Sequence, residues 1–185
     1  MVFDLNIKQY FSPNCGPRKH GSPPDMIVLH YTAMENVMSA IERLCDPKFE
    51  VSAHYIISKE GKITQMVDES LRSWHAGKGT WGQVRDINSH SIGIELDYCP
   101  SINDELDFDY LQLQALEVLL FDILNRRPEI IAKNIIGHSD MSPGRKFDPG
   151  RRFPWQTFAK KGLGVWPHNI ESKAPDWDIF KHAAK

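Results

Sequence analysis

The sequence predicts a single domain that mixes strands and helices, of the α/β or α+β class. Its length of 185 residues corresponds to about one domain. With 41% hydrophobic and 25% charged residues, its composition is typical of a globular chain. Short apolar runs of strand length alternate along the chain with stretches of helical periodicity, and this alternation predicts the mixed class.

The first half of the chain predicts three strands and one helix. Residues 11–25 are rich in Pro and Gly and predict a loop that leads into a buried strand at 26–29. A Thr-x-x-Glu capping box at 32–35, followed by apolar residues at helical spacing, predicts a helix that begins where this strand ends. Two β-prone runs at 53–58 and 63–67 flank a short link that contains Gly, which predicts an antiparallel hairpin.

The second half predicts a further strand, a long helix and two functional loops. Residues 91–97 alternate as a strand does, and apolar residues at helical spacing from 113 to 124 predict a helix that ends before the Arg-Pro pair at 127–128. The Gly- and Trp-rich stretch 72–88 and the Gly- and Pro-rich stretch 137–150 predict the loops. A short helix opening at 153–155 and an extended tail from 162 complete the chain.

Charge and hydropathy argue against several classes of partner. Lys and Arg total 22 and Asp and Glu total 24, so the net charge of −2 provides no field that would draw the chain to nucleic acid. The longest apolar stretch, 116–124, contains two acidic residues and is far shorter than the ~20 residues of a membrane span. Three cysteines at no metal-finger spacing predict no disulfide framework.

The N-terminal residues predict the compartment. Asp4 stands where a secretory signal would be basic, and no continuous apolar segment precedes Lys8. The odd number of cysteines also fits a reducing compartment. We therefore expect a cytoplasmic location. A periplasmic or cell-envelope location is the alternative if a signal has been removed from the chain.

Two histidines and an aspartate indicate a metal site. His30 ends the first long strand and His138 ends a short apolar run, so both rings are expected on the loop face of a sheet. A single histidine at such a position is more often structural, and that interpretation stays open. Asp148 adds an oxygen ligand, and two His with one carboxylate are typical of catalytic zinc. Non-haem iron uses the same donors, so the residues alone do not choose between the metals.

Five segments together resemble one known family. They are VLHYT at 28–32, SAH at 52–54, WHAG at 74–77, SIGIE at 91–95 and GHSDMSPGRKFDPG at 137–150. In their order and combination they are similar to the zinc-dependent N-acetylmuramoyl-L-alanine amidases of the AmpD-like, type 2 group. The resemblance runs from about residue 26 to residue 155.

The resemblance implies a fold and an activity. The fold is an α/β domain with a central mixed sheet flanked by helices, and one zinc ion per chain lies in an open groove at the sheet edge. The activity is hydrolysis of the amide between the lactyl group of N-acetylmuramic acid and L-alanine, in peptidoglycan or muropeptides, for cell-wall turnover or recycling. Related peptidoglycan-recognition proteins bind such fragments without cleaving them, so a non-catalytic recognition module is the alternative. The sequence does not reveal the oligomeric state, and a monomer is the default expectation.

The resemblance also implies roles for individual residues. His30, His138 and Asp148 align with the zinc ligands. Glu95 aligns with the acid that activates water, and burial between apolar neighbours is expected to raise its pKa into a useful range. Lys146 aligns with the basic residue beside the reacting carbonyl. The residues expected to contact the substrate are Trp74, His75, His54, Arg72 and Asn88.

The chain also departs from part of the family pattern. Some relatives carry a tyrosine immediately before the position of His54, and some use cysteine as the third ligand, whereas this chain has Ala53 and Asp148. The Glu95 form of the mechanism is therefore expected. His54 is equally compatible with a buried core histidine. The implied division of the chain is an N-terminal loop segment at 1–25, a catalytic core at 26–160 and a C-terminal extension at 161–185.

Overall fold

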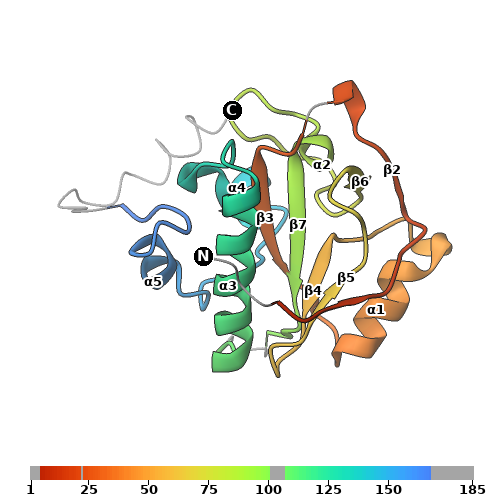
Figure 1. The fold of residues 1–185 in the computed structure, drawn as a ribbon, viewed down its shortest axis with the longest axis horizontal. Coiled ribbons are helices and arrows are strands. Elements are labelled where there is room, and N and C mark those ends of the chain that lie inside the picture. Colours follow the sequence, from red (N-terminus) through yellow and green to blue (C-terminus); the bar gives the residue numbers. More distant parts are fainter. Residues whose placement is uncertain (1–4, 22, 101–106, 168–185) are drawn as a thin grey trace.

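A mixed β-sheet forms the centre of the molecule (Figure 1). The computed structural model describes residues 5–21, 23–100 and 107–167. In order across the sheet, the strands are β1 (Ile7–Gln9), β5 (Ile63–Gln65), β4 (Tyr55–Ile57), β7 (Ser91–Leu96), β3 (Met26–Tyr31) and β8 (Ile135–Gly137). A separate antiparallel pair joins β2 (Cys15–Pro17) to β6 (Leu71–Ser73).

The sheet is mixed because one neighbouring pair runs antiparallel. That pair is β4 and β5, whose short connection makes the predicted hairpin. The other neighbouring pairs are parallel, so β3, β7 and β8 all end at the same edge of the sheet. The predicted central mixed sheet is confirmed.

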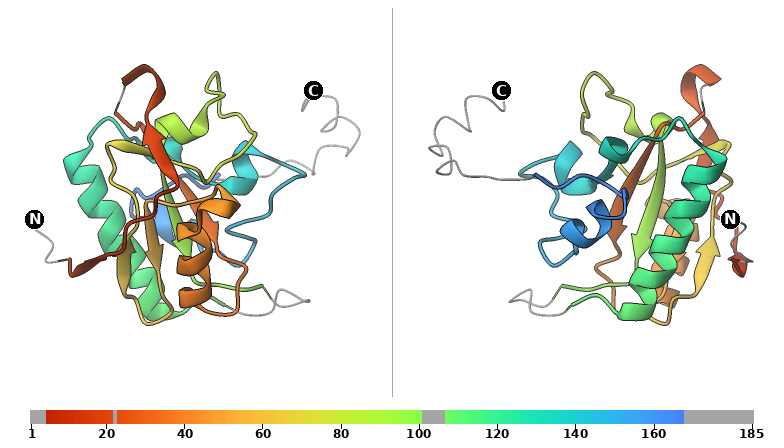
Figure 2. Two further views of the ribbon diagram at one scale, coloured as in Figure 1. Left: turned by 90° about the vertical axis from the view of Figure 1, so that its right-hand side faces the viewer. Right: turned by 60° about the vertical axis from the view of Figure 1, so that its left-hand side comes forward.

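Helices cover both faces of the sheet (Figure 2). One face packs against α3 (Tyr110–Arg126) and α5 (Trp155–Ala159). The other face packs against α1 (Val37–Cys45), α2 (Ile87–His90) and α4 (His138–Met141). Short 3-10 turns lie at Lys19–Gly21, Pro47–Phe49 and Ala132–Asn134. No helix among the described residues is long and apolar enough to cross a membrane.

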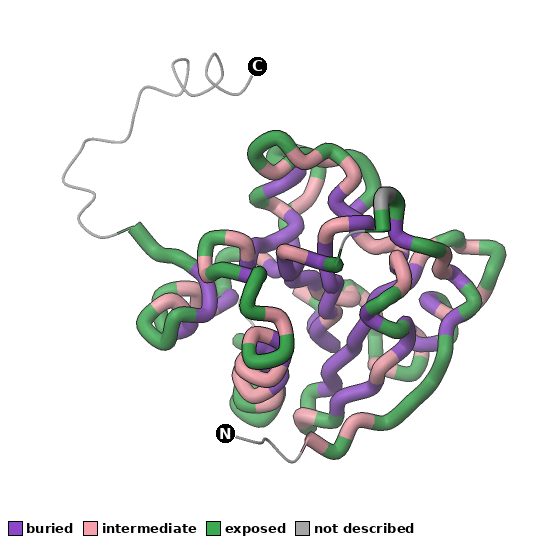
Figure 3. The backbone as a smooth tube through the Cα atoms, turned by 45° about the horizontal axis from the view of Figure 1, so that its top comes forward, coloured by how far each residue is buried: buried purple, intermediate pink, exposed green. Residues whose placement is uncertain are grey.

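The alternation of side chains along β3 divides the core. Ile27 and Leu29 pack with the α3 side of the sheet, whereas Met26 and Val28 pack with α2 and α4. Because both faces are covered, all four side chains are buried, and the strand is a continuous apolar run. Figure 3 shows that buried backbone runs through the middle of the molecule and exposed backbone lies around it. His30 has the parity of Met26 and Val28, so it lies on the α1, α2 and α4 face.

The helix after β3 starts later than the capping box predicts. Thr32 continues the β3–β7 ladder, because its N–H donates to the carbonyl of Leu96 at 2.9 Å. The N-cap is Asn36 instead, whose side-chain oxygen accepts a hydrogen bond from the N–H of Ser39 at 3.0 Å. The predicted long helix is confirmed as α3, and it ends at Arg126, before Pro128.

The two segments expected as loops hold short elements. The segment before residue 26 contributes β1 and β2, each of three residues. The stretch 137–150 opens with the single turn of α4 before it becomes irregular. The predicted short helix after Phe153 is α5. The tail from 162 has no helix or strand up to residue 167, and the rest of the predicted C-terminal extension lies outside the described residues.

Candidate metal centre and cleft

Strand register brings the candidate residues to one edge of the sheet. His30 on β3 is paired with Glu95 on β7, so the two side chains lie next to each other on the same face. Gly137 at the end of β8 is paired with Leu29, which places His138 directly beyond it, beside His30. Open α/β sheets form their sites at the carboxyl ends of parallel strands, as this one does.

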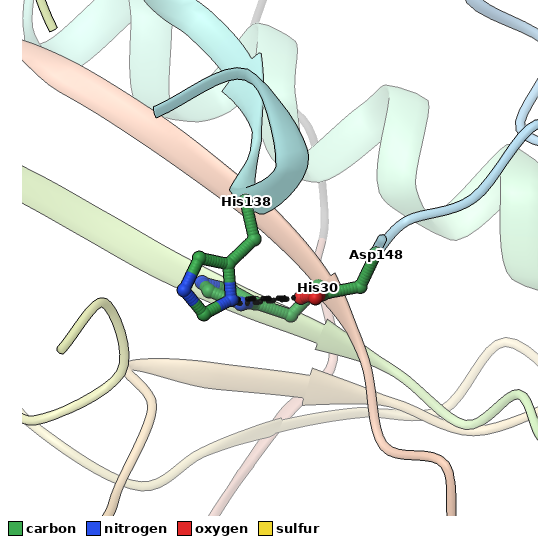
Figure 4. A group of neighbouring side chains, drawn as sticks. All are labelled: His30, His138 and Asp148. Carbon is green, nitrogen blue, oxygen red and sulfur yellow. Dashed lines mark hydrogen bonds and ion pairs between the residues drawn. The ribbon is translucent and has the colours of Figure 1, made fainter. Parts of the chain in front are cut away.

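Two histidines and an aspartate converge on one point (Figure 4). The Nδ1 atoms of His30 and His138 lie 2.9 Å apart, and Oδ2 of Asp148 lies 2.9 Å from the first and 3.0 Å from the second. All three residues are buried. The loop that carries Asp148 is tied to α4, because the N–H of Ser139 donates to the Asp148 carbonyl at 2.9 Å.

The chemistry of these atoms fits a bound cation. Nε2 of His138 lies 2.8 Å from the carbonyl of Ala76, which only accepts, so the proton is on Nε2 and Nδ1 carries a lone pair. That lone pair faces a second ring nitrogen and a carboxylate oxygen. Burial by itself raises the pKa of Asp148, but the histidine contacts outweigh it and hold that pKa well below its usual range. Nitrogen and oxygen donors with an open side suit zinc.

Burial also keeps His30 in the neutral form that binds metal. It lowers the pKa of His30 to about 4, so the ring is neutral at about pH 7. It holds the pKa of His75 well below the usual value, with the nearby His30 acting in the same direction. His75 lies next to the centre, with its Nδ1 2.9 Å from Nε2 of His30 and its Nε2 3.1 Å from the hydroxyl of Ser91.

The centre opens into a cavity of about 350 Å³. Glu95 and Lys146 line it together with the three converging residues. Among the described residues, Oε2 of Glu95 is buried with no hydrogen-bond partner. Burial, with the negative charge of Asp148, raises the pKa of Glu95 to about 8, while Lys146 acts in the opposite direction. Glu95 is therefore a group that exchanges a proton close to neutral pH.

Three of the residues expected to contact the substrate, Trp74, His75 and Asn88, line this cavity or a second one beside it. Trp74 and His75 line the first cavity directly, and all three line the second, of about 260 Å³. The side-chain oxygen of Asn88 accepts hydrogen bonds from the backbone N–H groups of His75, at 3.2 Å, and of Ala76, at 2.8 Å. Asn88 thus also fixes the loop that carries the tryptophan.

His54 and Arg72 do not line either of these cavities. His54 has no exposed surface, and its Nδ1 accepts a hydrogen bond from the N–H of Gly93 at 3.0 Å. The expected substrate contact of His54 is therefore corrected: His54 is a core histidine that is hydrogen-bonded to Gly93 of β7. Arg72 donates to Asp86 at 3.1 Å and anchors α2 to β6.

Other residues on the cavity wall were not identified from the sequence. Phe147 lines the cavity and is 71% exposed. Its position between Lys146 and Asp148 in the sequence could have identified it as a cavity residue. Arg43 comes from α1, and its guanidinium stands 4.1 Å from the ring centre of Phe49. No pattern in α1 separates this arginine from an ordinary exposed one.

Comparisons with known proteins identify relatives of this chain. Residues 20–151 match the family described as N-acetylmuramoyl-L-alanine amidase. The chain is 36% identical to N-acetylmuramoyl-L-alanine amidase AmiD of Escherichia coli over 154 residues, which cover 77% of this chain and 54% of AmiD. It is 32% identical to 1,6-anhydro-N-acetylmuramyl-L-alanine amidase AmpD of Haemophilus influenzae over 170 residues, 83% of this chain and 90% of that enzyme.

A solved structure of a relative also holds a substrate. It is the complex of E. coli AmiD with anhydro-N-acetylmuramic acid-L-Ala-D-γ-Glu-L-Lys. The TM-score between this structure and the present chain is 0.73 at 34% sequence identity, and the match covers 82% of this chain and 62% of the AmiD chain. The present chain therefore spans only about half to two thirds of AmiD but nearly all of the H. influenzae enzyme.

Proposed function

Because the chain belongs to the N-acetylmuramoyl-L-alanine amidase family, we propose that it hydrolyses the amide bond between the lactyl group of N-acetylmuramic acid and L-alanine. The substrate class is peptidoglycan fragments or muropeptides, in cell-wall turnover or recycling. One observation supports this most strongly: His30, His138 and Asp148 converge in the same cavity as Glu95 and Lys146.

We assign His30, His138 and Asp148 as ligands of one zinc ion per chain. Their three donor atoms point to one place from β3, from the start of α4 and from the following loop. Zinc bound there supplies a Lewis acid that polarises the amide carbonyl and lowers the pKa of a water molecule.

Glu95 and Lys146 complete the chemistry. Glu95 takes a proton from the attacking water, whose oxygen bonds to the carbonyl carbon, and then delivers this proton to the alanine nitrogen as the carbon–nitrogen bond breaks. A carboxyl with a pKa raised to about 8 is suited to holding the proton between the two steps. Lys146 stabilises the negative charge that develops on the carbonyl oxygen. The products are a muramic sugar acid and a free stem peptide.

The experiment uses a defined substrate, anhydro-N-acetylmuramic acid carrying a tripeptide, and measures free stem peptide by chromatography. The wild-type chain with zinc is expected to release the peptide, and a chelator is expected to stop the release. Glu95→Gln removes the proton acceptor but none of the ligands. We expect it to bind zinc normally and to lower turnover by about 10²–10⁴-fold. Unchanged turnover of this variant would remove Glu95 from the mechanism.

The same experiment tests the alternative function. A non-catalytic recognition module would bind the muropeptide, detectable by calorimetry, and would release no stem peptide with or without zinc. The Oε2 atom of Glu95 argues against it, because this atom is buried without a hydrogen-bond partner among the described residues and a binding site gains nothing from such an atom. The compartment in which the chain acts stays a prediction from the sequence.

A further inference from the structure

The hydrogen bonds behind His30 form a directed chain that ends at a backbone carbonyl. Nε2 of His30 lies 2.9 Å from Nδ1 of His75, and Nε2 of His75 lies 3.1 Å from the hydroxyl oxygen of Ser91. That hydroxyl in turn lies 2.7 Å from the carbonyl oxygen of Ile87. The contacts run from β3 through the loop after β6 to β7 and the start of α2.

The carbonyl at the end fixes the direction of every bond in the chain. A carbonyl oxygen only accepts, so Ser91 uses its one proton to donate to Ile87. The Ser91 oxygen must then accept from His75, which places the His75 proton on Nε2 and leaves Nδ1 without a proton. The unprotonated Nδ1 of His75 must accept a hydrogen bond from His30, which places the His30 proton on Nε2. The remaining nitrogen of His30, Nδ1, is left with a lone pair facing Asp148 and His138.

From this geometry we infer that His75 is a positioning residue: together with Ser91 it holds His30 in the tautomer and orientation that a metal ligand needs. The inference rests on the proposed metal site. It changes the expected role of His75, because both of its ring nitrogens are within hydrogen-bond distance of protein atoms although the ring lines the cleft. A ligand histidine is ordinarily fixed through its second nitrogen by a carboxylate, carbonyl or water. Here a neutral imidazole does so.

The two ligand histidines are therefore fixed by different means. His138 donates directly to the carbonyl of Ala76 at 2.8 Å. His30 reaches its carbonyl only through two intervening side chains, so substitutions can interrupt its support without touching a ligand. The His75 ring is held in place from both sides, standing edge-on to His30 with ring centres 5.0 Å apart and to His54 with ring centres 6.0 Å apart.

The first test measures zinc affinity by competition with a chromophoric chelator, with zinc alone as the probe. His75→Leu keeps the bulk of the ring but offers no acceptor, and we expect its zinc Kd to rise by about 10–100-fold. His75→Asn offers an amide oxygen near the position of Nδ1, and we expect it to recover part of this loss. Ser91→Ala leaves His75 in place but removes its proton acceptor, so a smaller rise is expected. The matched control is His90→Leu, because His90 lies at the end of α2 and outside both cavities.

The second test reads the tautomer directly in the metal-free chain, by ¹⁵N NMR of the histidine rings. In the wild-type chain His30 is expected to carry its proton on Nε2, and in His75→Leu it is expected to populate both tautomers. A merely structural role of His75 would change stability but not this signature.

The outcomes separate this inference from the proposed function. A wild-type chain that binds no zinc would overturn both. A wild-type chain that binds zinc, with His75→Leu equal to it in zinc Kd or with His30 protonated on Nδ1, would overturn this inference alone. A higher KM for the muropeptide with unchanged zinc Kd would instead make His75 a substrate contact.

Discussion

Gly93 on β7 shows how an absent side chain shapes the metal centre. A Cβ atom at this position would lie 2.5 Å from Cγ and 2.7 Å from Nδ1 of His75, closer than real Cβ contacts come. The backbone of Gly93 also makes two hydrogen bonds to His54. The N–H of Gly93 donates to Nδ1 of His54, and the backbone N–H of His54 donates to the carbonyl of Gly93, both at 3.0 Å. Glycine is therefore required here for space, because the His75 ring lies directly over the strand.

We predict that Gly93→Ala weakens the metal centre without altering a ligand. The added methyl group must displace the His75 ring, which is confined between His30 and His54, so overpacking is expected to destabilise the chain by about 1–3 kcal/mol. The displaced ring no longer supports His30, and zinc Kd is expected to rise. Urea unfolding and chelator competition measure the two effects.

The matched control for this variant is Gly16→Ala on β2. A Cβ there meets nothing within 4 Å, so both the free energy of unfolding and the zinc Kd should stay close to wild type. Equal behaviour of the two variants would show that Gly93 is not required for space.

The sequence pointed to the three residues that converge, but not to the side chains that contact them. The donor chemistry of His30, His138 and Asp148 suggests a metal site, and the family resemblance aligns the three residues with zinc ligands. The contact between His30 and His75 depends on the β3–β7 register and on the missing side chain of Gly93. Neither leaves a periodic signal, so composition and spacing cannot reveal it.

At the scale of elements, Glu69 joins the turn after β5 to β4 and to the end of α3. Its side chain is 6% exposed and accepts hydrogen bonds from Tyr55, at 2.8 Å, from both terminal nitrogens of Arg126, at 2.9 and 3.0 Å, and from Arg127, at 3.1 Å. Burial raises the pKa of Glu69, but these hydrogen bonds outweigh it and hold the pKa below its usual value. The charged form therefore stabilises the fold.

We predict that Glu69→Gln lowers the free energy of unfolding by about 1–3 kcal/mol at about pH 7, because buried donors lose their charged acceptor. The pKa of Glu69 is lower in the folded chain than in the unfolded chain. The charged carboxylate therefore stabilises the fold at pH values above the pKa of a glutamate in the unfolded chain, and this stabilisation is lost as the pH falls through the pKa of Glu69 in the folded chain. The difference between variant and wild type should therefore shrink below about pH 4. Urea unfolding of the metal-free chains at several pH values measures it.

Glu117→Gln is the matched control for Glu69→Gln. Glu117 pairs with Lys161 at the surface, where both side chains are partly exposed, and such pairs contribute about 0–1 kcal/mol. Two results would contradict the stabilising role of the buried Glu69 carboxylate. One is that Glu117→Gln lowers the free energy of unfolding as much as Glu69→Gln does. The other is that the difference in unfolding free energy between Glu69→Gln and wild type does not change with pH.

Most elements that the sequence predicted have a strong pattern of their own, and the short strands β4 and β5 were predicted from β-prone residues on both sides of a link that contains Gly. The apolar runs of β3 and β7 and the helical stripe of α3 each span six or more residues. By contrast, β1 and β2 have three residues each, and β2 contains Gly and Pro. Such strands form because a neighbour offers unpaired backbone groups, so they depend on β5 and β6 rather than on their own residues.

At the scale of the whole molecule, the metal centre exists only in the folded chain. Its proposed ligands are residues 30, 138 and 148, and the first lies more than a hundred positions away from the others. They meet because β8 pairs with β3, which places His138 beside His30. Since an unfolded chain cannot hold the three donors together, zinc is expected to bind the native state far more tightly than the unfolded one.

We therefore predict that zinc raises the melting temperature. Free zinc at about 100 times its Kd should stabilise the chain by about 2.7 kcal/mol, since the ligand binds only the folded state. For a domain of this size each kcal/mol corresponds to about 2–4 °C, so the expected rise is roughly 5–10 °C. Thermal unfolding followed by circular dichroism, with and without zinc, measures it.

Asp148→Asn tests whether this stabilisation arises at the proposed centre. The amide keeps the shape of the side chain but removes the charge that faces the two Nδ1 atoms, so the zinc-dependent rise should largely disappear. An undiminished rise in this variant would locate the stabilising zinc elsewhere on the chain. No rise in the wild type at saturating zinc would show that the convergence of His30, His138 and Asp148 is a hydrogen-bonded core cluster, because linkage requires any ligand that selects the folded state to stabilise it.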